Sequence, residues 1–204
     1  MQATGIQGQT GKQTGQNIPI SVGETSDQLV TELQPRYYEN TYRNQKFSAC
    51  ATAAVTVGAL TATNVSFALY NPPSSGKNLV LVSAGFGVAS TTFATGALFL
   101  AYNVQTATPL STTALAIRSN LLTGNTAASV AQAYSAATLS STPVAVAPIF
   151  GFTVSATIGS PVQPAQWDAG GQIVVAPGGV LSIQGSVASL ALGYPSLTWD
   201  EIAI

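Results

Sequence analysis

Hydrophobic and polar residues alternate with a period of two along much of residues 47–204. Four stretches carry this pattern most clearly: Asn64–Leu69, Phe150–Ser155, Leu181–Gln184 and Ala114–Ile117. A period of two places successive side chains on opposite faces of an extended backbone. Each stretch therefore predicts a β-strand whose apolar face is buried and whose other face carries small or polar residues.

Two continuous apolar runs, Leu79–Val82 and Ala97–Ala101, predict central strands that are covered on both faces. Turn-forming residues separate the predicted strands at Asn71–Gly76, Thr123–Asn125, Gly159–Pro161, Ala169–Gly171 and Pro177–Gly179. Eight or more short strands with such turns, and with no helical period, predict an all-β antiparallel sandwich. Their long connections favour a jelly-roll-like arrangement.

The N-terminal part of the chain differs from this body in composition. Residues 1–23 are rich in Gly, Gln and Thr, which is typical of an extended arm. Residues 24–46 hold seven of the thirteen charged residues, and their pattern predicts a short helix over Ser26–Gln34. The sequence thus predicts an extended arm over residues 1–46 and one β-sandwich domain over residues 47–204.

The chain carries very little charge. Only 6% of its residues are Asp, Glu, Lys or Arg, where about 25% is usual. The 24 Thr and 20 Ser residues outnumber the charged residues more than threefold, and such a surface suits broad contact with neighbouring subunits. Six scattered basic residues and a net charge of −1 do not form the basic patch that nucleic-acid binding needs. We therefore expect no nucleic-acid partner.

The reactive side chains do not predict catalysis. The chain has no histidine, which excludes a Ser-His-Asp triad, a Cys-His pair and a histidine metal site within it. The one cysteine, Cys50, lies among alanines and is interpreted as a small buried apolar residue. Asp200 and Glu201 are adjacent, so in a strand they point to opposite faces, although either could still pair with Asp168. We expect no enzyme activity, no catalytic residue, no metal and no cofactor.

Two further stretches resemble sites of other kinds. Ser74–Lys77 is similar to the end of a phosphate-binding loop, but Asn71 and Asn78 occupy two of the four fixed positions of that motif. It therefore predicts a turn between two strands, and no small-molecule substrate is expected. Residues 78–117 contain no charge, yet glycines and hydroxyls fill their centre, which favours strand, turn and strand over a membrane-spanning helix.

Several apolar residues are candidate contacts with partners. Tyr37, Tyr38 and Tyr42 follow the charged segment and form either an aromatic contact patch or a cover for the edge of the body. Trp167, beside Asp168, is either a sugar-stacking aromatic or a loop tryptophan that closes the core. The full set of candidate contact residues is Ile6, Ile18, Ile20, Tyr37, Tyr38, Tyr42 and Trp167.

Four stretches of the body also carry a family resemblance: Phe47-Ser48, Asn71–Asn78 with the apolar strand after it, Pro177–Gln184, and Thr198–Ile202. They are similar to the turn-and-strand signatures of jelly-roll virion proteins of tailed bacteriophages, especially capsid decoration or cement proteins. The resemblance covers residues 47–204. It implies a structural protein on the outer capsid surface that binds the major capsid protein and associates with itself as a homotrimer.

The start of the chain has neither a basic nor an apolar leader segment. We therefore expect synthesis in a reducing host cytoplasm and no membrane partner. The main alternative to a shell protein is a tail, collar or fibre component that binds a receptor or a host-surface glycan. Exposed aromatics such as Trp167 or Tyr194 around a groove would favour that alternative. Readings as an enzyme or a membrane protein remain as lesser alternatives.

Overall fold

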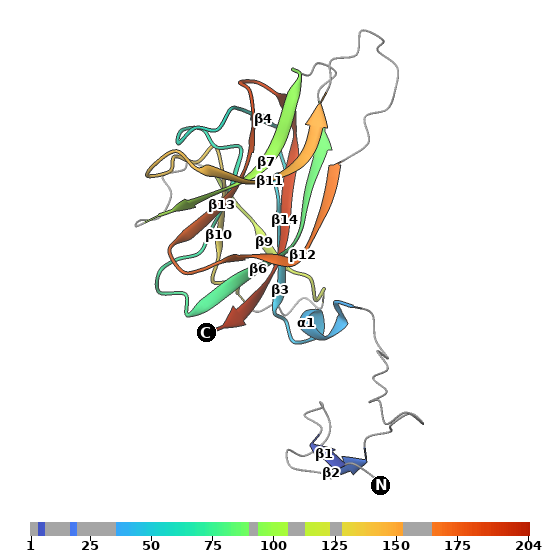
Figure 1. Cartoon of the computed structure of the whole chain (residues 1–204). Coiled ribbons are helices and arrows are strands. Elements are labelled where there is room, and N and C mark those ends of the chain that lie inside the picture. Colours follow the sequence, from blue (N-terminus) through green and yellow to red (C-terminus); the bar gives the residue numbers. More distant parts are fainter. Residues whose placement is uncertain are drawn as a thin grey trace. The chain divides into compact units, whose positions relative to one another are not determined.

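The computed structural model describes residues 4–6, 17–19, 36–89, 94–105, 113–122, 128–152 and 165–204. The chain forms two units, Met1–Glu39 and Asn40–Ile204 (Figure 1). In the first unit, β1 (Thr4–Ile6) pairs antiparallel with β2 (Asn17–Pro19). The predicted helix over Ser26–Gln34 and most of the predicted arm lie outside the described residues.

The second unit is built from a ribbon of eight strands that is folded over on itself. In chain order the strands are β3 (Lys46–Cys50), β5 (Phe67–Tyr70), β6 (Lys77–Val88), β7 (Gly96–Val104), β11 (Val144–Phe152), β12 (Ala165–Val175), β13 (Gly179–Gly185) and β14 (Ala191–Ala203). The first strand pairs with the last, the second with the seventh, the third with the sixth and the fourth with the fifth. Double-sheet folding of such a ribbon is the jelly-roll architecture. The predicted all-β, jelly-roll-like antiparallel sandwich is confirmed.

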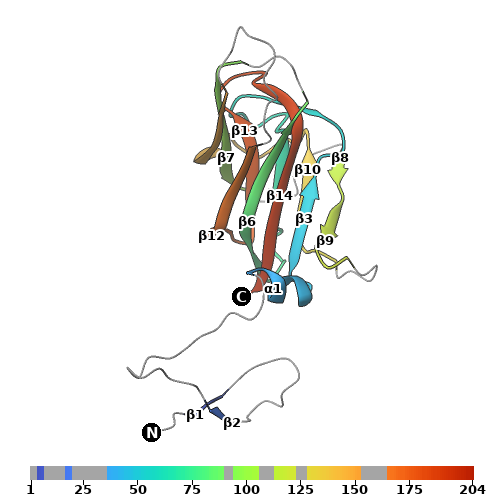
Figure 2. The same ribbon diagram turned by 90° about the vertical axis from the view of Figure 1, so that its right-hand side faces the viewer.

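The strands form two layers. Sheet I has the order β12-β6-β14-β3-β9, and sheet II has the order β11-β7-β13-β5-β10-β8. Figure 2 shows sheet I with β12 on the left, β14 in the middle and β9 on the right. The remaining strands are β4 (Val55–Val57), which pairs with β14, β8 (Thr113–Leu115), β9 (Ile117–Ser119) and β10 (Gln132–Ser135).

One predicted strand is in fact a corner between the two sheets. The alternation of Leu115 and Ile117 with their alanine neighbours predicts a single strand, but the structure places Leu115 in β8 and Ile117 in β9. These strands belong to different sheets, and only Ala116 separates them. Both large residues still pack against the core, so the apolar pattern is satisfied by a bend between the layers.

The core lies between the two sheets. Its largest fully buried apolar side chains include Phe47, Leu79, Leu81, Phe86 and Trp199 from sheet I, and Phe67, Leu69, Leu98, Leu100, Leu181 and Ile183 from sheet II. Phe47 stacks on Trp199 with ring centroids 6.5 Å apart, and Phe152 meets Phe86 edge to face at 6.2 Å. Such aromatic pairs stabilise a core beyond the area they bury.

Both predicted central strands have a neighbour on each side. The run Leu79–Val82 lies in β6, between β12 and β14, and the run Ala97–Ala101 lies in β7, between β11 and β13. Their outward residues Val80, Ala97 and Phe99 are only half-buried. The prediction of cover on both faces is therefore wrong for these three residues, although the central position of both strands is confirmed.

Sheet II is also buried on part of its outer face, around β5 and β13, because other parts of the chain lie over it. The outward apolar cluster consists of Ala68, Tyr70 and Val180 from the sheet with Val65, Ala137 and Leu139 from the covering segments. The Asn103 side chain donates to the carbonyl of Ser141, and the Gln105 side chain accepts from the N–H of Ser140, each at 2.9 Å. These bonds fasten the segment after β10 across the sheet.

This cover overturns the prediction of a single buried face for two strands. Every residue of β5 and of β13 is buried. The polar residues on the outer side of β13 are satisfied locally, since the Ser182 hydroxyl donates to the Ala101 carbonyl at 3.2 Å and the Gln184 side chain accepts from the Thr61 N–H at 2.9 Å. Val65, expected beside Phe67 on the core face, lies in the outer cluster instead.

The predicted turn between Tyr70 and Lys77 is confirmed, and Asn71 fixes it. The Asn71 side chain is fully buried and donates to the carbonyls of Lys77 at 2.8 Å and Val175 at 2.9 Å. Its own N–H and carbonyl bond to the predicted turn at Pro177–Gly179. One asparagine thus joins the β5–β6 turn to the β12–β13 turn. The residues similar to a phosphate-binding loop, Ser74–Lys77, belong to this turn between strands.

Two local predictions on sheet I are wrong. Ala169–Gly171 is not a turn between strands but part of a bulge inside β12, where the register jumps between Asp168 and Ile173. Gly170 and Gly171 have positive φ angles there, a conformation that glycine adopts easily. Cys50 is exposed rather than buried, because Phe47 and Ala49 fill the core face of β3 and the alternation turns Cys50 outward.

Two tyrosines in and beside the outward cluster on sheet II, Tyr70 and Tyr134, are expected to make the protein less stable as the pH rises into the alkaline range. Burial raises the pKa of Tyr70, and burial followed by the neighbouring Tyr70 raises the pKa of Tyr134, both above the usual value of 10.0. The unfolded chain therefore loses these phenol protons first as the pH rises. Their contribution to stability is complete below about pH 10 and is lost above it.

We expect the free energy of unfolding to fall between about pH 9 and about pH 11, and to fall less steeply in Tyr70→Phe, which has no phenol proton at this position. Urea denaturation at each pH measures both slopes. Loss of lysine charge affects the two proteins equally, so the comparison isolates the tyrosine. An identical slope in the variant would contradict the role of Tyr70.

Candidate interaction surface

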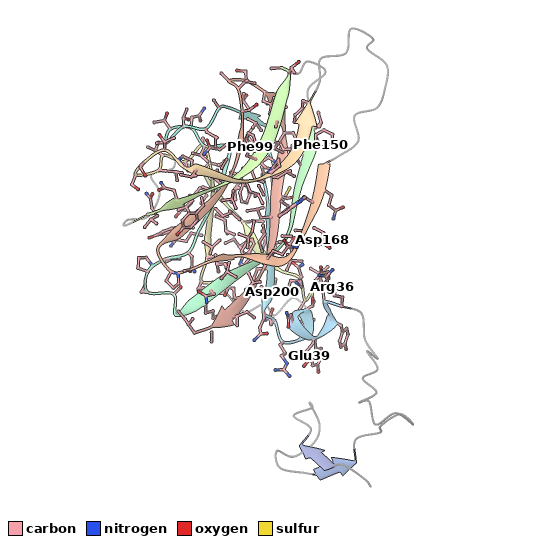
Figure 3. The ribbon with its side chains drawn as sticks, viewed as in Figure 1. Arg36, Glu39, Phe99, Phe150, Asp168 and Asp200 are labelled. Atoms are coloured by element: carbon pink, nitrogen blue, oxygen red, sulfur yellow. The ribbon has the colours of Figure 1, made fainter. Side chains whose placement is uncertain are left out.

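Two ion pairs, one of them buried and one with a partly exposed lysine, engage four charged side chains of the second unit. The Lys46 ammonium and the Asp200 carboxylate are 2.6 Å apart, with side chains 4% and 8% exposed. The two residues lie opposite each other in β3 and β14. Asn40, in the short helix α1 (Tyr38–Tyr42), donates its side-chain N–H to Asp200 at 2.8 Å. Figure 3 labels Asp200 at the end of the sandwich near α1.

Glu201 has separate partners, as its predicted orientation opposite to Asp200 requires. Its side chain is fully buried and lies 3.0 Å from the Lys77 ammonium. It also accepts the Ser129 hydroxyl at 2.5 Å and the Val130 N–H at 3.1 Å. The two adjacent carboxylates are therefore held in different sets of contacts, and neither of these sets includes Asp168. Each acidic side chain has a structural role.

The predicted tyrosine patch is only partly exposed. Tyr38 and Tyr42 are 46% and 55% exposed. They stand four residues apart in α1, so they share one side of the helix. Tyr37 precedes the helix and is half-buried, with the Arg36 guanidinium 5.0 Å from the centre of its ring. Tyr38 and Tyr42 are thus more exposed than Tyr37, and their role as partner contacts stays a prediction.

The two aromatics proposed to line a glycan groove lie on opposite faces of sheet I. Trp167 belongs to strand β12, not to a loop, and packs half-buried against the core opposite Ala84. Tyr194 is 40% exposed and stands opposite Gly87, on the outer face. The structure therefore assigns the core-closing role to Trp167, with a correction to its place in the chain, and does not bring it together with Tyr194.

The candidate isoleucines of the arm are placed only in part. Ile6 ends β1, opposite Asn17, and Ile18 lies in β2, opposite Gly5. Ile20 lies outside the described residues. The described backbone thus puts Ile6 and Ile18 in one small antiparallel sheet.

The outer face of sheet I carries two rows of mostly small residues that run across its strands. One row of directly paired residues crosses all five strands: Arg118, Ser48, Thr198, Ser83 and Asp168. A second row contains Cys50, Ser196, Gly85 and Gln166. The three hydroxyl residues of the first row are half-buried, whereas Arg118 and Asp168 at its two ends are exposed. The row therefore carries opposite charges at its ends and none between them.

Other exposed apolar residues are scattered over strand edges and ends. The most exposed are Leu122, Ile204, Val144, Val104 and Val174. Val144 lies on the edge strand β11, whose pairing with β7 contains two register shifts and whose sequence includes Pro148. Bulges and proline discourage a second strand from pairing with an edge. This edge is therefore poorly suited to backbone pairing with another strand.

The sequence predicted neither the row from Arg118 to Asp168 nor the two ion pairs. The residues of this row come from five strands that are distant along the chain, and only the register of the sheet brings them into line. The small number of charges was the available signal, since each charged residue in so neutral a body is expected to have a structural or contact role.

The described residues offer neither a metal site nor a membrane-spanning helix. Among the described residues, no group of three or more Cys, Asp or Glu side chains gathers where it could hold a metal ion. In the same part of the chain, no helix is both long enough and apolar enough to span a bilayer. Comparisons with protein-family models, with curated proteins and with solved structures found no match to this chain.

Proposed function

We propose that this protein is a structural virion protein, a capsid decoration or cement protein that binds the assembled shell of a tailed bacteriophage through its arm and its sandwich. The jelly-roll topology supports the proposal because this architecture recurs in viral capsid proteins. Topology by itself does not define function, so the proposal rests on the surface that the fold presents.

The main support for the proposal is that most charged side chains of the second unit are paired with one another. Four of its seven charged side chains, Lys46, Lys77, Asp200 and Glu201, are engaged in the two ion pairs. The surface left for partners consists largely of hydroxyls, amides and small apolar groups. Covering such a surface requires little removal of water from charges, which suits a protein that contacts several shell subunits at once.

The mechanism is mass action. A protein that binds only the assembled shell stabilises that form by the free energy of binding. The arm and the sandwich act as two linked contacts, and linkage raises the overall affinity above that of either contact. The proposed partners are the major capsid protein and further copies of this chain, on the outer surface of the virion.

The copy number in purified particles tests the proposal directly. We expect a simple ratio between this chain and the major shell protein, measured by quantitative mass spectrometry of intact particles. A few copies per particle would instead support the tail, collar or fibre alternative. Absence from particles would overturn the assignment to the virion.

Deletion of residues 1–23 should weaken attachment and leave the sandwich folded. The paired sheets and the core of the sandwich are formed by residues 46–203, so we expect an unchanged melting temperature. Loss of one of two linked contacts should reduce the affinity for shells by about tenfold or more. Co-sedimentation with shells measures this affinity, and undiminished attachment of the shortened protein would contradict the role of the arm.

A further inference from the structure

The boundary between the two units of the chain falls inside α1, between Glu39 and Asn40. The helix has five residues, and none of them is buried. So short a helix is not stable by itself, because fixing the backbone of its first turn costs more than the few hydrogen bonds of that turn contribute. Contacts with other parts of the protein therefore keep α1 helical, and α1 is the point at which the arm joins the second unit.

Asn44 ends the helix in a motif that also holds the next residue. Its N–H donates to the Thr41 carbonyl at 3.0 Å, and the Gln45 N–H donates to the Asn40 carbonyl at 2.9 Å. The φ angle of Asn44 is 58°, in the left-handed region that asparagine tolerates better than most residues. Two such bonds around a left-handed residue form a Schellman motif. Residues 40–45 are therefore one closed turn.

Three hydrogen bonds fasten this turn to sheet I. The Asn40 side chain donates to the Asp200 carboxylate of β14 at 2.8 Å. The Ser119 hydroxyl of β9 donates to the side chain of Asn44. A backbone N–H of β14 donates to the Gln45 carbonyl at 2.8 Å. Because these bonds come from two strands and reach both ends of the turn, they hold it as a unit.

The same turn shares Asp200 with the buried ion pair. One carboxylate oxygen of Asp200 accepts the Asn40 N–H, and the other lies 2.6 Å from the Lys46 ammonium. The Lys46 contact joins directly paired residues of β3 and β14, so it belongs to the sheet, whereas the Asn40 contact belongs to the turn. Release of the turn would leave the ion pair in place and expose one oxygen of Asp200 to water, which can replace the lost donor.

We propose that residues 40–45 form a latch that opens and closes on sheet I while the sandwich stays folded. Among the described residues, the core clusters begin at Phe47 along the chain, so the latch lies outside them. Segments of this kind open at a lower free energy than global unfolding. Because the chain runs directly from the arm into the latch, a partner that draws the arm away opens the latch before it separates β3 from β14. Latch closure and such binding influence each other equally, as linkage requires.

Amide hydrogen exchange of the full-length chain at low urea concentrations, followed by NMR, tests the latch. The N–H groups of Asn44, Gln45 and Glu201 bond within the latch or to it. We expect their protection to be weaker, by about tenfold or more, than that of the Asn71 and Gly178 N–H groups, which join the β5–β6 turn to the β12–β13 turn. Urea should leave latch protection nearly unchanged, because local opening exposes little surface, and should lower protection in the two turns.

Two further variants identify the contact that holds the latch. Asn40→Ala removes the bond to Asp200 and should weaken latch protection by about tenfold or more, since a hydrogen bond to a charged group is lost. Asn78→Ala is the matched control, because it is the same substitution on β6 of the same sheet, opposite Ile202, and should leave latch protection unchanged. In the double variant Lys46→Met/Asp200→Leu the acceptor is already gone, so adding Asn40→Ala should have no further effect.

The latch is overturned if urea lowers the protection of Asn44, Gln45 and Glu201 as steeply as that of the two turns, because α1 would then be released only when the sandwich unfolds. It is equally overturned if Asn40→Ala leaves latch protection unchanged, or weakens it just as much in the double variant, because the bond to Asp200 would then not hold the turn closed. The first two measurements are decisive even if the double variant does not fold. All of them use the free chain, so the latch goes beyond the proposed function, and its failure would leave the proposal of shell binding untouched.

Discussion

Gly193→Ala should destabilise the protein by about 3 kcal/mol or more, because the added methyl group has no space. Gly193 lies in β14 where that strand pairs with both β4 and β6. A Cβ atom there would lie 2.6 Å from the Phe86 ring and still closer to the carbonyl oxygen of Gly87. The Gly87 oxygen belongs to the backbone of the neighbouring strand, so relief requires the two strands to separate.

Gly87→Ala provides the matched control. Gly87 is on β6, opposite Tyr194, and the atoms nearest to its added Cβ would belong to Tyr194, at 3.7 Å or more. We expect a change within about 1 kcal/mol. In thermal unfolding, Gly193→Ala should lower the melting temperature by about 10 °C. Equal melting temperatures for the two variants would show that the space around Gly193 is larger than the structure indicates.

Much of the architecture could be predicted from local pattern. The alternation near Phe67 and Leu181, the apolar runs at Leu79–Val82 and Ala97–Ala101, and the turn after Tyr70 all correspond to elements of the fold. The period of side-chain alternation and the turn chemistry act over a few residues, so they survive any arrangement of the strands. The jelly-roll expectation followed from the number and spacing of these elements.

The errors arose where distant segments decide burial. Ser182 and Gln184 have polar side chains typical of an exposed face, but the segments before β5 and after β10 cover them. Cys50 has apolar neighbours in sequence, yet the direction of β3 turns it outward. Trp167 follows turn residues but lies in β12. Local composition contains no information about such long-range contacts.

The row from Arg118 to Asp168 could be predicted from the sequence even less than these burial patterns. Arg118 and Asp168 are fifty residues apart, and their alignment depends on the register of five strands. A shift of one residue in any strand would move a side chain to the other face. Sequence reasoning could identify these residues as two of the few charges in the body, but it could not place them in one row.

Asp200→Leu should destabilise the protein by about 3–5 kcal/mol, since it leaves the buried Lys46 ammonium without its carboxylate. The Lys46 side chain is only 4% exposed, so water cannot readily replace the lost partner. Asn40 also loses the acceptor of its side-chain N–H. Urea denaturation with unchanged slope against urea concentration would measure this loss of stability.

The double variant Lys46→Met/Asp200→Leu distinguishes the cost of an isolated charge from the net value of the pair. Replacing both members by apolar side chains of similar volume removes the buried charges together, and such replacements are often neutral or stabilising. We expect it to recover most of the loss. Lys77→Met is the comparison: Lys77 is 35% exposed, and Glu201 keeps its bonds from Ser129 and Val130, so the loss should be only about 1–2 kcal/mol. If Lys46→Met/Asp200→Leu remained as unstable as Asp200→Leu, the pair would contribute stability of its own, and the low charge of this fold would have to be explained by something other than the cost of burying ions.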